Sequence, residues 1–324
     1  MSFSPNMNFS RIEDCIDVRR MQGARVALIG AGGSHGLACH LVRSGLGAID
    51  LYDFDVVSAE NIPRQAHSFT SIGTPKVEAL ASDLQRINPD VEVRGFRRDV
   101  TTMTDAEVAE SFAGVDLIIH ATDSFQAHAW GNRVALQFGI PSIWIGLYPH
   151  GAAGEIVFWH PGLLACYRCL CPKRYAAHER AAAEGRSLDP SSHGCTIFDI
   201  TQLDAVAGEI AVGQLTRGAN NRFGRLIDEL GDRNFIQLQF HADWSLNGRN
   251  PVREKLGVAA DNAAYFAWNA IVLSDPDRGQ LYCPDCERYR GHEFPYPRLG
   301  CQTRIVPPQT AKVSTHERGV EHVA

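Results

Sequence analysis

The sequence has no apolar run close to the ~20 residues that a transmembrane helix needs, and no internal repeat or low-complexity tract. Its N-terminal segment, residues 1–22, contains Asp and Glu but no apolar core, so we do not expect a signal peptide there. Basic residues are not in excess, because 31 Lys and Arg stand against 37 Asp and Glu. The formal charge of −6 argues against a nucleic-acid binder. We therefore expect a globular protein located in the cytoplasm.

Cysteine is the residue type whose count is unusual. The chain has 324 residues, of which 44% are apolar and 21% charged, close to the globular average. Against this ordinary background there are nine cysteines, an odd number that cannot all pair. In a reducing compartment thiols serve as metal ligands or nucleophiles more often than as disulfides. The cysteines are therefore candidates for chemistry.

Strand-like and helix-like segments alternate at roughly 25-residue spacing over the first half of the chain. The expected strands are 25–29, 48–52, 91–96, 116–121, 142–146 and 155–159. The expected helices between them are 37–44, 76–87, 105–112 and 125–138. Such alternation predicts an α/β fold built on a doubly wound, Rossmann-like, mostly parallel sheet with right-handed crossovers.

The pattern changes after residue 160. We expect a helix over 173–185, a long helix over 197–215 and a strand over 235–240, whereas 245–280 shows no clear periodicity. The chain therefore divides into an N-terminal helical segment (1–22), the Rossmann-like domain (23–160), a C-terminal portion of the same fold (161–302) and a flexible tail (303–324).

A glycine-rich loop follows the first expected strand. Gly30, Gly32 and Gly33 stand where backbone amides and a helix N-terminus form an anion site. Asp53, after the second strand, is placed to accept hydrogen bonds from ribose hydroxyls. A nicotinamide-dependent oxidoreductase would share both features, so they do not distinguish it from an ATP-binding enzyme.

Charged residues further along the chain favour a triphosphate ligand. Arg64 and Lys76 would bring two cations to the cofactor cleft, where they can neutralise phosphate charge in the transition state. Asp123 follows the fourth strand, on the same rim as the glycine loop, and a carboxylate beside phosphates is a natural magnesium ligand.

Five segments in this order resemble the ubiquitin-activating-enzyme-like superfamily, whose bacterial members are ThiF-type and MoeB-type adenylyltransferases. They are Gly-Ala-Gly-Gly, Asp-Phe-Asp, Asn-Ile-Pro-Arg-Gln, Gly-Thr-Pro-Lys and Ala-Thr-Asp. The resemblance implies that residues 23–160 form an ATP-binding adenylation domain. It implies ATP and magnesium contacts from Gly30, Gly32, Gly33, Asp53, Asp55, Asn61, Arg64, Gln65, Lys76 and Asp123.

The sequence departs from the family pattern in the glycine loop. His35 stands where the family usually has the last glycine of Gly-x-Gly-Gly-x-Gly, and it would either narrow the pocket or reach a phosphate. Ser124 replaces the common Asn after the magnesium-binding Asp. Many relatives donate an N-terminal Arg across a dimer, and Arg11 is the nearest candidate here.

Two Cys-x-x-Cys pairs account for four cysteines. Cys166 and Cys169 form one pair, and Cys283 and Cys286 form the other; together they complete a tetrahedral zinc site. One such pair alone would be a candidate redox site, but two in one chain favour structural zinc. The fold would then carry a zinc-pinned C-terminal extension. Cys171 is close enough in sequence to replace one of the four ligands.

Cys195 is the candidate nucleophile. It lies in a polar loop beside His193, just before the long helix, whose dipole would stabilise a thiolate. The Cys-Thr pair resembles the thioester-forming cysteine of ubiquitin-activating enzymes. The alternative is a small buried cysteine without chemistry, which is also our interpretation of Cys15, Cys39 and Cys301.

The resemblance implies a two-step reaction. ATP would adenylate the C-terminal carboxylate of a ubiquitin-like or sulfur-carrier protein ending in glycine, with release of pyrophosphate, and Cys195 would then take the acyl group as a thioester. Expected partners are that carrier, a second copy of the chain and a conjugating-enzyme-like protein. The alternatives are adenylation of a sulfur carrier, tRNA or peptide carboxylate without a stable thioester, and an inactive zinc-pinned dimeric scaffold.

Overall fold

The computed structural model describes residues 7–188, 194–240, 249, 270–274 and 282–291. In these residues eight strands form one sheet in the order β3-β2-β1-β4-β5-β6-β7-β8. The strands are β1 (Arg25–Ile29), β2 (Ala48–Tyr52), β3 (Glu92–Phe96), β4 (Leu117–His120), β5 (Ser142–Leu147), β6 (Ala153–Trp159), β7 (Phe235–Gln239) and β8 (Ala270–Ser274).

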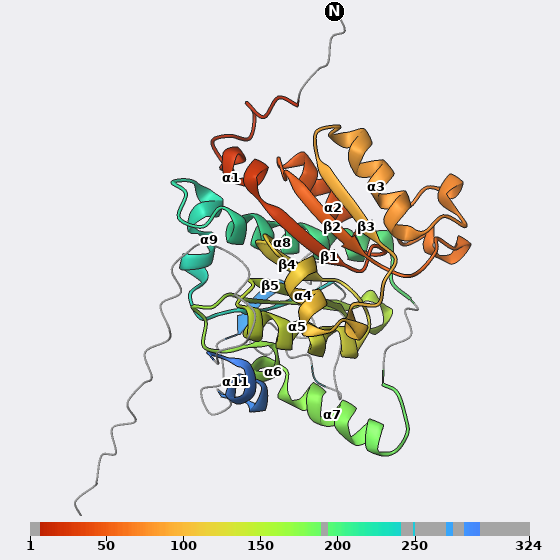
Figure 1. Cartoon of the computed structure of the whole chain (residues 1–324), viewed down its shortest axis with the longest axis vertical. Helices are drawn as coiled ribbons and strands as arrows, with labels where there is room; N and C mark the ends of the chain where they lie inside the picture. Colours follow the sequence, from red (N-terminus) through yellow and green to blue (C-terminus); the bar gives the residue numbers. More distant parts are fainter. Residues whose placement is uncertain (1–6, 189–193, 241–248, 250–269, 275–281, 292–324) are drawn as a thin grey trace, which may run out of the picture.

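Helices connect the strands and flank the sheet (Figure 1). They are α1 (Val18–Gly23), α2 (His35–Arg43), α3 (Lys76–Ile87), α4 (Asp105–Ser111), α5 (Phe125–Phe138), α6 (Tyr167–Leu170), α7 (Pro172–Ala183), α8 (Ile197–Leu215), α9 (Arg222–Leu230) and α11 (Pro284–Tyr289). Short 3-10 helices are η1 (Ala59–Asn61), η2 (Phe69–Ser71), η3 (Val100–Thr102) and η4 (Pro149–Gly151). None of the described helices is long and apolar enough to span a membrane.

Strands β1 to β5 are parallel, as the sequence predicts. Consecutive residues of β1 alternate between two cores: Leu28 packs with α2, α3 and α8, whereas Ile29 packs with α4 and α5. Both faces are therefore buried, which explains why these strands are continuous apolar runs. The doubly wound fold is confirmed.

The last three strands differ from the expected crossover pattern. β5 pairs with β6, β6 with β7 and β7 with β8, all antiparallel. Only residues 148–152 join β5 to β6, too few for the helix that a parallel crossover requires. Residues after 160 therefore extend the same sheet with antiparallel strands.

Several predicted segments differ from the structure or lie outside it. In the N-terminal segment the only described α-helix is α1 (Val18–Gly23), because residues 9–15 form turns. The sequence patterns did not indicate α6, α9 or α11. The predictions for His193, Cys301 and the tail 303–324, and most of those for 245–280, lie outside the described residues.

Candidate functional site

The strand order places a crevice at one point on the sheet. The chain leaves β1 toward β2 and β3 on one side, then returns to β4 on the other side. In such sheets ligands bind at this switch point, beyond the carboxyl ends of the central strands. The glycine loop follows β1 and Asp123 follows β4, so both border this crevice.

The glycine loop is held by close backbone contacts. A Cβ on Gly30 would lie 2.7 Å from the Ala121 carbonyl oxygen, and one on Gly32 would lie 2.9 Å from Gln65 Nε2. Gly30, with its positive φ of 96° and a backbone atom as neighbour, therefore requires glycine, whereas a side chain at position 32 would displace Gln65. A Cβ on Gly33 would meet nothing within 4 Å. Open space beside a glycine at a helix N-terminus suits a phosphate, as the sequence predicts for this loop.

Asp53 connects the loop to the residues after β2. Its carboxylate accepts hydrogen bonds from the Ala31 amide at 2.8 Å and the Asp55 amide at 2.9 Å. Asp55 in turn pairs with the buried Lys76 ammonium at 2.8 Å. The Asp55 carboxylate thus holds the lysine that the sequence predicts to bind phosphate. Nucleotide phosphates would compete with this carboxylate for the Lys76 ammonium.

The segment after Asp55 folds into η1. Ser58 and Asn61 form a capping box, so the Asn61 side chain is partly engaged in holding this turn. Gln65 is buried against Gly32, which places it beside the glycine loop as predicted. Arg64 projects from the same turn toward a different part of the chain.

Arg64 contacts Cys195, which is 131 residues distant in the sequence. The guanidinium Nη1 lies 3.4 Å from the Cys195 Sγ. Cys195 is partly exposed, which removes the alternative of a fully buried cysteine. One residue therefore connects the predicted nucleotide site with the predicted nucleophile.

The Cys195 loop also packs against η4. A Cβ on Gly151 would lie 3.1 Å from the Cys195 Cα, and a Cβ on Gly194 would lie 2.9 Å from His150 Nδ1. The N-cap of α8 is Thr196, whose hydroxyl accepts from the Asp199 amide. Cys195 thus immediately precedes the N-cap, in the loop just before α8, as the sequence predicts.

Asp123 and Ser124 begin α5. Asp123 is exposed two residues beyond Ala121, which touches the glycine loop. Ser124 is the N-cap, accepting from the Ala127 amide at 3.3 Å. An exposed carboxylate at this edge provides the oxygen ligand that magnesium prefers. Arg11 lies exposed in the turn before α1, and a role across a dimer stays a prediction.

The His35 side chain has different neighbours from those that the sequence suggests. Its ring is 2% exposed and contacts His67 and Asp83, in place of the expected narrowing of the pocket or contact with a phosphate. His67 reaches the Ala31 carbonyl. Sequence reasoning missed His67 and Asp83, because no motif marks either residue.

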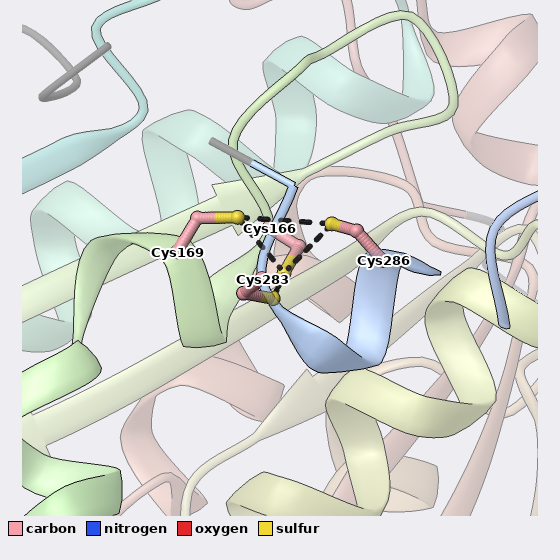
Figure 2. Close-up of side chains that lie close together, drawn as sticks. All are labelled: Cys166, Cys169, Cys283 and Cys286. Atoms are coloured by element: carbon pink, nitrogen blue, oxygen red, sulfur yellow. Dashed lines mark hydrogen bonds between the residues drawn. The ribbon is translucent and has the colours of Figure 1, made fainter. Parts of the chain in front are cut away.

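The two Cys-x-x-Cys pairs meet in a closed cluster (Figure 2). Cys166 Sγ lies 3.5 Å from both Cys283 Sγ and Cys286 Sγ, and Cys169 Sγ lies 3.7 Å from Cys286 Sγ. Tetrahedral zinc with Zn–S bonds of about 2.3 Å separates neighbouring sulfurs by about 3.8 Å. The four side chains therefore fit zinc, and all but Cys283 are buried.

Polar contacts hold the two halves of the cluster together. Asp285 on α11 accepts from Asn132 on α5 and from Arg168 on α6, both at 2.8 Å. Arg290 Nη2 donates to Cys286 Sγ at 3.3 Å. Figure 1 shows α11 beside α6, although the paired cysteines are 117 residues apart. Cys171 is not in the cluster.

A buried ion pair joins β6 and α7 and was missed by sequence reasoning. Glu155 on β6 accepts from Tyr148 at 2.6 Å and from Arg174 on α7. Burial would raise the pKa of Glu155, but the Arg174 guanidinium outweighs it and lowers that pKa. Tyr148 is therefore fixed in this network.

His120 is a core residue. It is fully buried on β4 and stacks on Trp144 at 5.2 Å between ring centroids. Burial keeps its pKa well below the usual value, so the imidazole is neutral. This agrees with the packing role that its place in an apolar strand suggests.

Comparisons with known proteins point to one group. A family model described as the ThiF family matches residues 3–227. The ubiquitin-like modifier-activating enzyme 5 of Drosophila simulans is 29% identical over 180 residues, covering 52% of this chain and 45% of the relative. The SAMP-activating enzyme E1 of Haloferax volcanii is 35% identical over 157 residues, covering 48% and 56%. The chain thus spans about half the length of these curated relatives.

Solved structures agree on the fold. E. coli MccB, in a crystal structure with AMPCPP and selenomethionyl MccA, superposes with a TM-score of 0.57 at 17% identity, covering 81% of this chain and 66% of MccB. PaaA superposes with a TM-score of 0.54 at 18% identity, covering 77% of this chain and 84% of PaaA. At such low identities these likenesses concern architecture alone.

Proposed function

The chain belongs to the ThiF family, and from this membership and the geometry of the crevice we propose that it is an ATP-dependent adenylyltransferase. Its substrate is the C-terminal carboxylate of a ubiquitin-like or sulfur-carrier protein. The observation that carries the proposal is the open glycine loop at the switch point, to which the buried Lys76 is linked through Asp55 and Asp53. Both curated relatives are named as activating enzymes.

The first step needs charge neutralisation and placement. A carboxylate oxygen of the carrier attacks the α-phosphorus of ATP, the bond to the β-phosphate oxygen breaks, and pyrophosphate leaves with the electron pair. The carboxylate is already a nucleophile, so no base is required. Lys76 would exchange Asp55 for phosphate oxygens, and Gly33 leaves room for them. Magnesium at Asp123 would neutralise further phosphate charge.

The second step would use Cys195. Its thiolate attacks the acyl carbon of the adenylate, the bond to the AMP oxygen breaks, and AMP leaves. The Arg64 contact supports this assignment, because it joins Cys195 to a residue just after the η1 turn, beside the nucleotide site. The Cys195 loop contacts η4, which directly follows β5. The loop therefore lies next to the carboxyl end of that strand.

Zinc would have a structural role. The four cysteines leave no open position for a substrate, and three of them are buried. Bound zinc would fix α11 against α6 and α5, as Asp285 also does. This supports our division of the chain at residue 160, in which the later portion packs against the adenylation domain.

We also propose a homodimer in the cytoplasm and a conjugating-enzyme-like acceptor. The dimer is supported by large exposed apolar side chains in the segment between β2 and α3. These are Phe54, Val56, Phe69 and Ile72, with Phe69 76% exposed. Exposed apolar groups gathered in one segment are typical of interfaces. Light scattering at known concentration measures the predicted dimer mass directly, and a monomer over the whole concentration range would contradict it.

ATP–pyrophosphate exchange tests the adenylation. With a small ubiquitin-like protein ending in glycine, the zinc-loaded enzyme should incorporate labelled pyrophosphate into ATP. A carrier shortened by its last glycine is the matched control and should give no exchange. The proposal would be contradicted if exchange took place at the same rate without the carrier. It would also be contradicted if no glycine-ending carrier gave any exchange.

A peptide carboxylate is the second candidate substrate. MccB, which shares the fold with this chain, was crystallised together with MccA. The Arg64 contact to Cys195 favours the thioester route, which a peptide adenylation does not need. A thiol-sensitive carrier adduct distinguishes the two, because the peptide route would form none. If the chain were instead an inactive scaffold, it would bind no ATP.

A further inference from the structure

Two buried histidines and a carboxylate form one chain of contacts beside the glycine loop. His67 Nε2 lies 3.0 Å from the Ala31 carbonyl oxygen, and His67 Nδ1 lies 3.1 Å from His35 Nδ1. His35 Nε2 lies 3.1 Å from Asp83 Oδ2 on α3. The two rings are 2% and 4% exposed. The contacts therefore run from a helix on the sheet face to the backbone of the loop.

The number of protons in this chain decides how many contacts can form. The Ala31 carbonyl only accepts, so His67 Nε2 must carry a proton, and the same holds for His35 Nε2 facing the Asp83 carboxylate. A third proton must lie between the two Nδ1 atoms. Burial lowers the pKa of both imidazoles to about 4, so at neutral pH each carries one proton. Three contacts then share two protons.

We propose that His67, supported by His35, positions the glycine loop for ATP, and that the network does so fully only when it holds a third proton. The inference rests on the proposed function, in which the loop binds ATP. Without that proton, one of the three contacts sets two lone pairs against each other, and the Ala31 carbonyl is held less firmly. The extra proton comes from solvent, so ATP binding should weaken as the pH rises.

Charged groups on neighbouring elements also face this network. Arg86 pairs with Asp83 on the same helix. Lys76 lowers the pKa of His67 and Asp53 raises it, both as lesser influences than burial. Asp204 on α8 accepts from the Leu37 amide, two residues beyond His35, and burial raises its pKa to about 8. Asp204 therefore titrates at higher pH than the two imidazoles and requires its own control.

Asp83→Asn isolates the proton. An amide N–H would donate to His35 Nε2, so two neutral imidazoles would satisfy all three contacts. Calorimetry of ATP–Mg binding to the whole, zinc-loaded protein between about pH 4.5 and about pH 7, just above the titration of the two imidazoles, should show a dissociation constant that rises about threefold more for the wild type than for Asp83→Asn. Asp90→Asn removes an exposed carboxylate from the following turn and should keep the wild-type slope, as should Asp204→Asn.

His67 variants test the positioning itself. His67→Ala should weaken ATP binding about tenfold, whereas His67→Gln keeps an N–H for the Ala31 carbonyl and should restore affinity without a pH slope. Thermal melting of both variants identifies any loss of folding. A flat wild-type profile, an unchanged slope in Asp83→Asn, or wild-type affinity in His67→Ala would each overturn the inference.

The proton count can be tested without ATP. Nitrogen-15 shifts of the two rings in the ligand-free protein should report three protonated nitrogens at low pH and two at high pH; two throughout would refute the count. A wild type that shows this change but binds no ATP would contradict the proposed function and leave the network intact. The two failures are therefore distinguishable.

Discussion

Cys195 and the Cys166 cluster place the same side chain in opposite surroundings. Cys195 is partly exposed, lies beside Arg64 and precedes the N-cap of α8. In the cluster of Cys166, Cys169, Cys283 and Cys286 every sulfur neighbours other sulfurs. Burial, followed by the contacts with the other three cysteines, raises the pKa of Cys166. The surroundings therefore favour attack on a substrate at one place and metal binding at the other.

Removal of one zinc ligand should have the largest effect. Cys286→Ser should reduce bound zinc from one per chain to none and lower the free energy of unfolding by on the order of 5 kcal/mol, because α11 would lose its covalent connection to α6. Elemental analysis and denaturant unfolding measure both. Cys171→Ser is the matched control, since Cys171 is buried outside the cluster. Full zinc content in Cys286→Ser would contradict the site.

Removal of a charge from the crevice should affect catalysis next. Lys76→Ala and Asp123→Ala should each lower the pyrophosphate exchange rate by about 100-fold, because each removes stabilisation of phosphate charge in the transition state. Arg86→Ala, an exposed cation on the same helix as Lys76, should leave the rate within about twofold. Equal rates in Lys76→Ala and Arg86→Ala would contradict a role for the Lys76 charge in catalysis.

Cys195→Ala should block thioester formation without blocking adenylation. It should abolish the thiol-sensitive carrier adduct while leaving pyrophosphate exchange within about threefold, because no atom of Cys195 takes part in adenylation. Nonreducing gels and exchange assays on the same samples measure both quantities. Cys15→Ala removes another accessible thiol and should retain the adduct. An adduct persisting in Cys195→Ala would assign the thioester elsewhere.

The smallest expected effect concerns α8, the helix that follows Cys195. Burial raises the pKa of Asp204 to about 8 in the folded state, well above its unfolded value. The carboxylate therefore contributes most stability below the unfolded pKa, and that contribution is lost as the pH rises toward 8. Asp204→Asn should stabilise the protein by on the order of 2 kcal/mol at about pH 9 and by little near pH 4. Identical gains at both pH values would contradict the raised pKa.

Much of the fold follows from local patterns. The residues of β1, β2, α3, α5 and α8 agree with the expected segments end to end, because buried parallel strands and amphipathic helices have distinct periodicities. The cysteine cluster was likewise predicted from its spacing alone, and its four sulfurs meet. The antiparallel pairing of β6, β7 and β8 was not, because it depends on contacts between distant segments.

The site was predictable only where a motif marks it. Gly30, Gly32 and Lys76 stand in recognisable motifs, and the structure places them at one crevice. The contact of Arg64 with Cys195 spans 131 residues, and no local pattern could reveal it. His67 was missed for the same reason, since its partners His35 and Ala31 lie 32 and 36 residues earlier in the sequence.

Mass spectrometry of the carrier tests the central claim most directly. Cys195→Ala, incubated with ATP–Mg and a ubiquitin-like protein ending in glycine, should accumulate the carrier with one added adenylyl group, since the next acceptor is missing. Lys76→Ala in the same background is the matched control and should show little of this species. A carrier mass that stays unchanged with folded, zinc-loaded enzyme would contradict the proposal that this crevice activates a carboxylate.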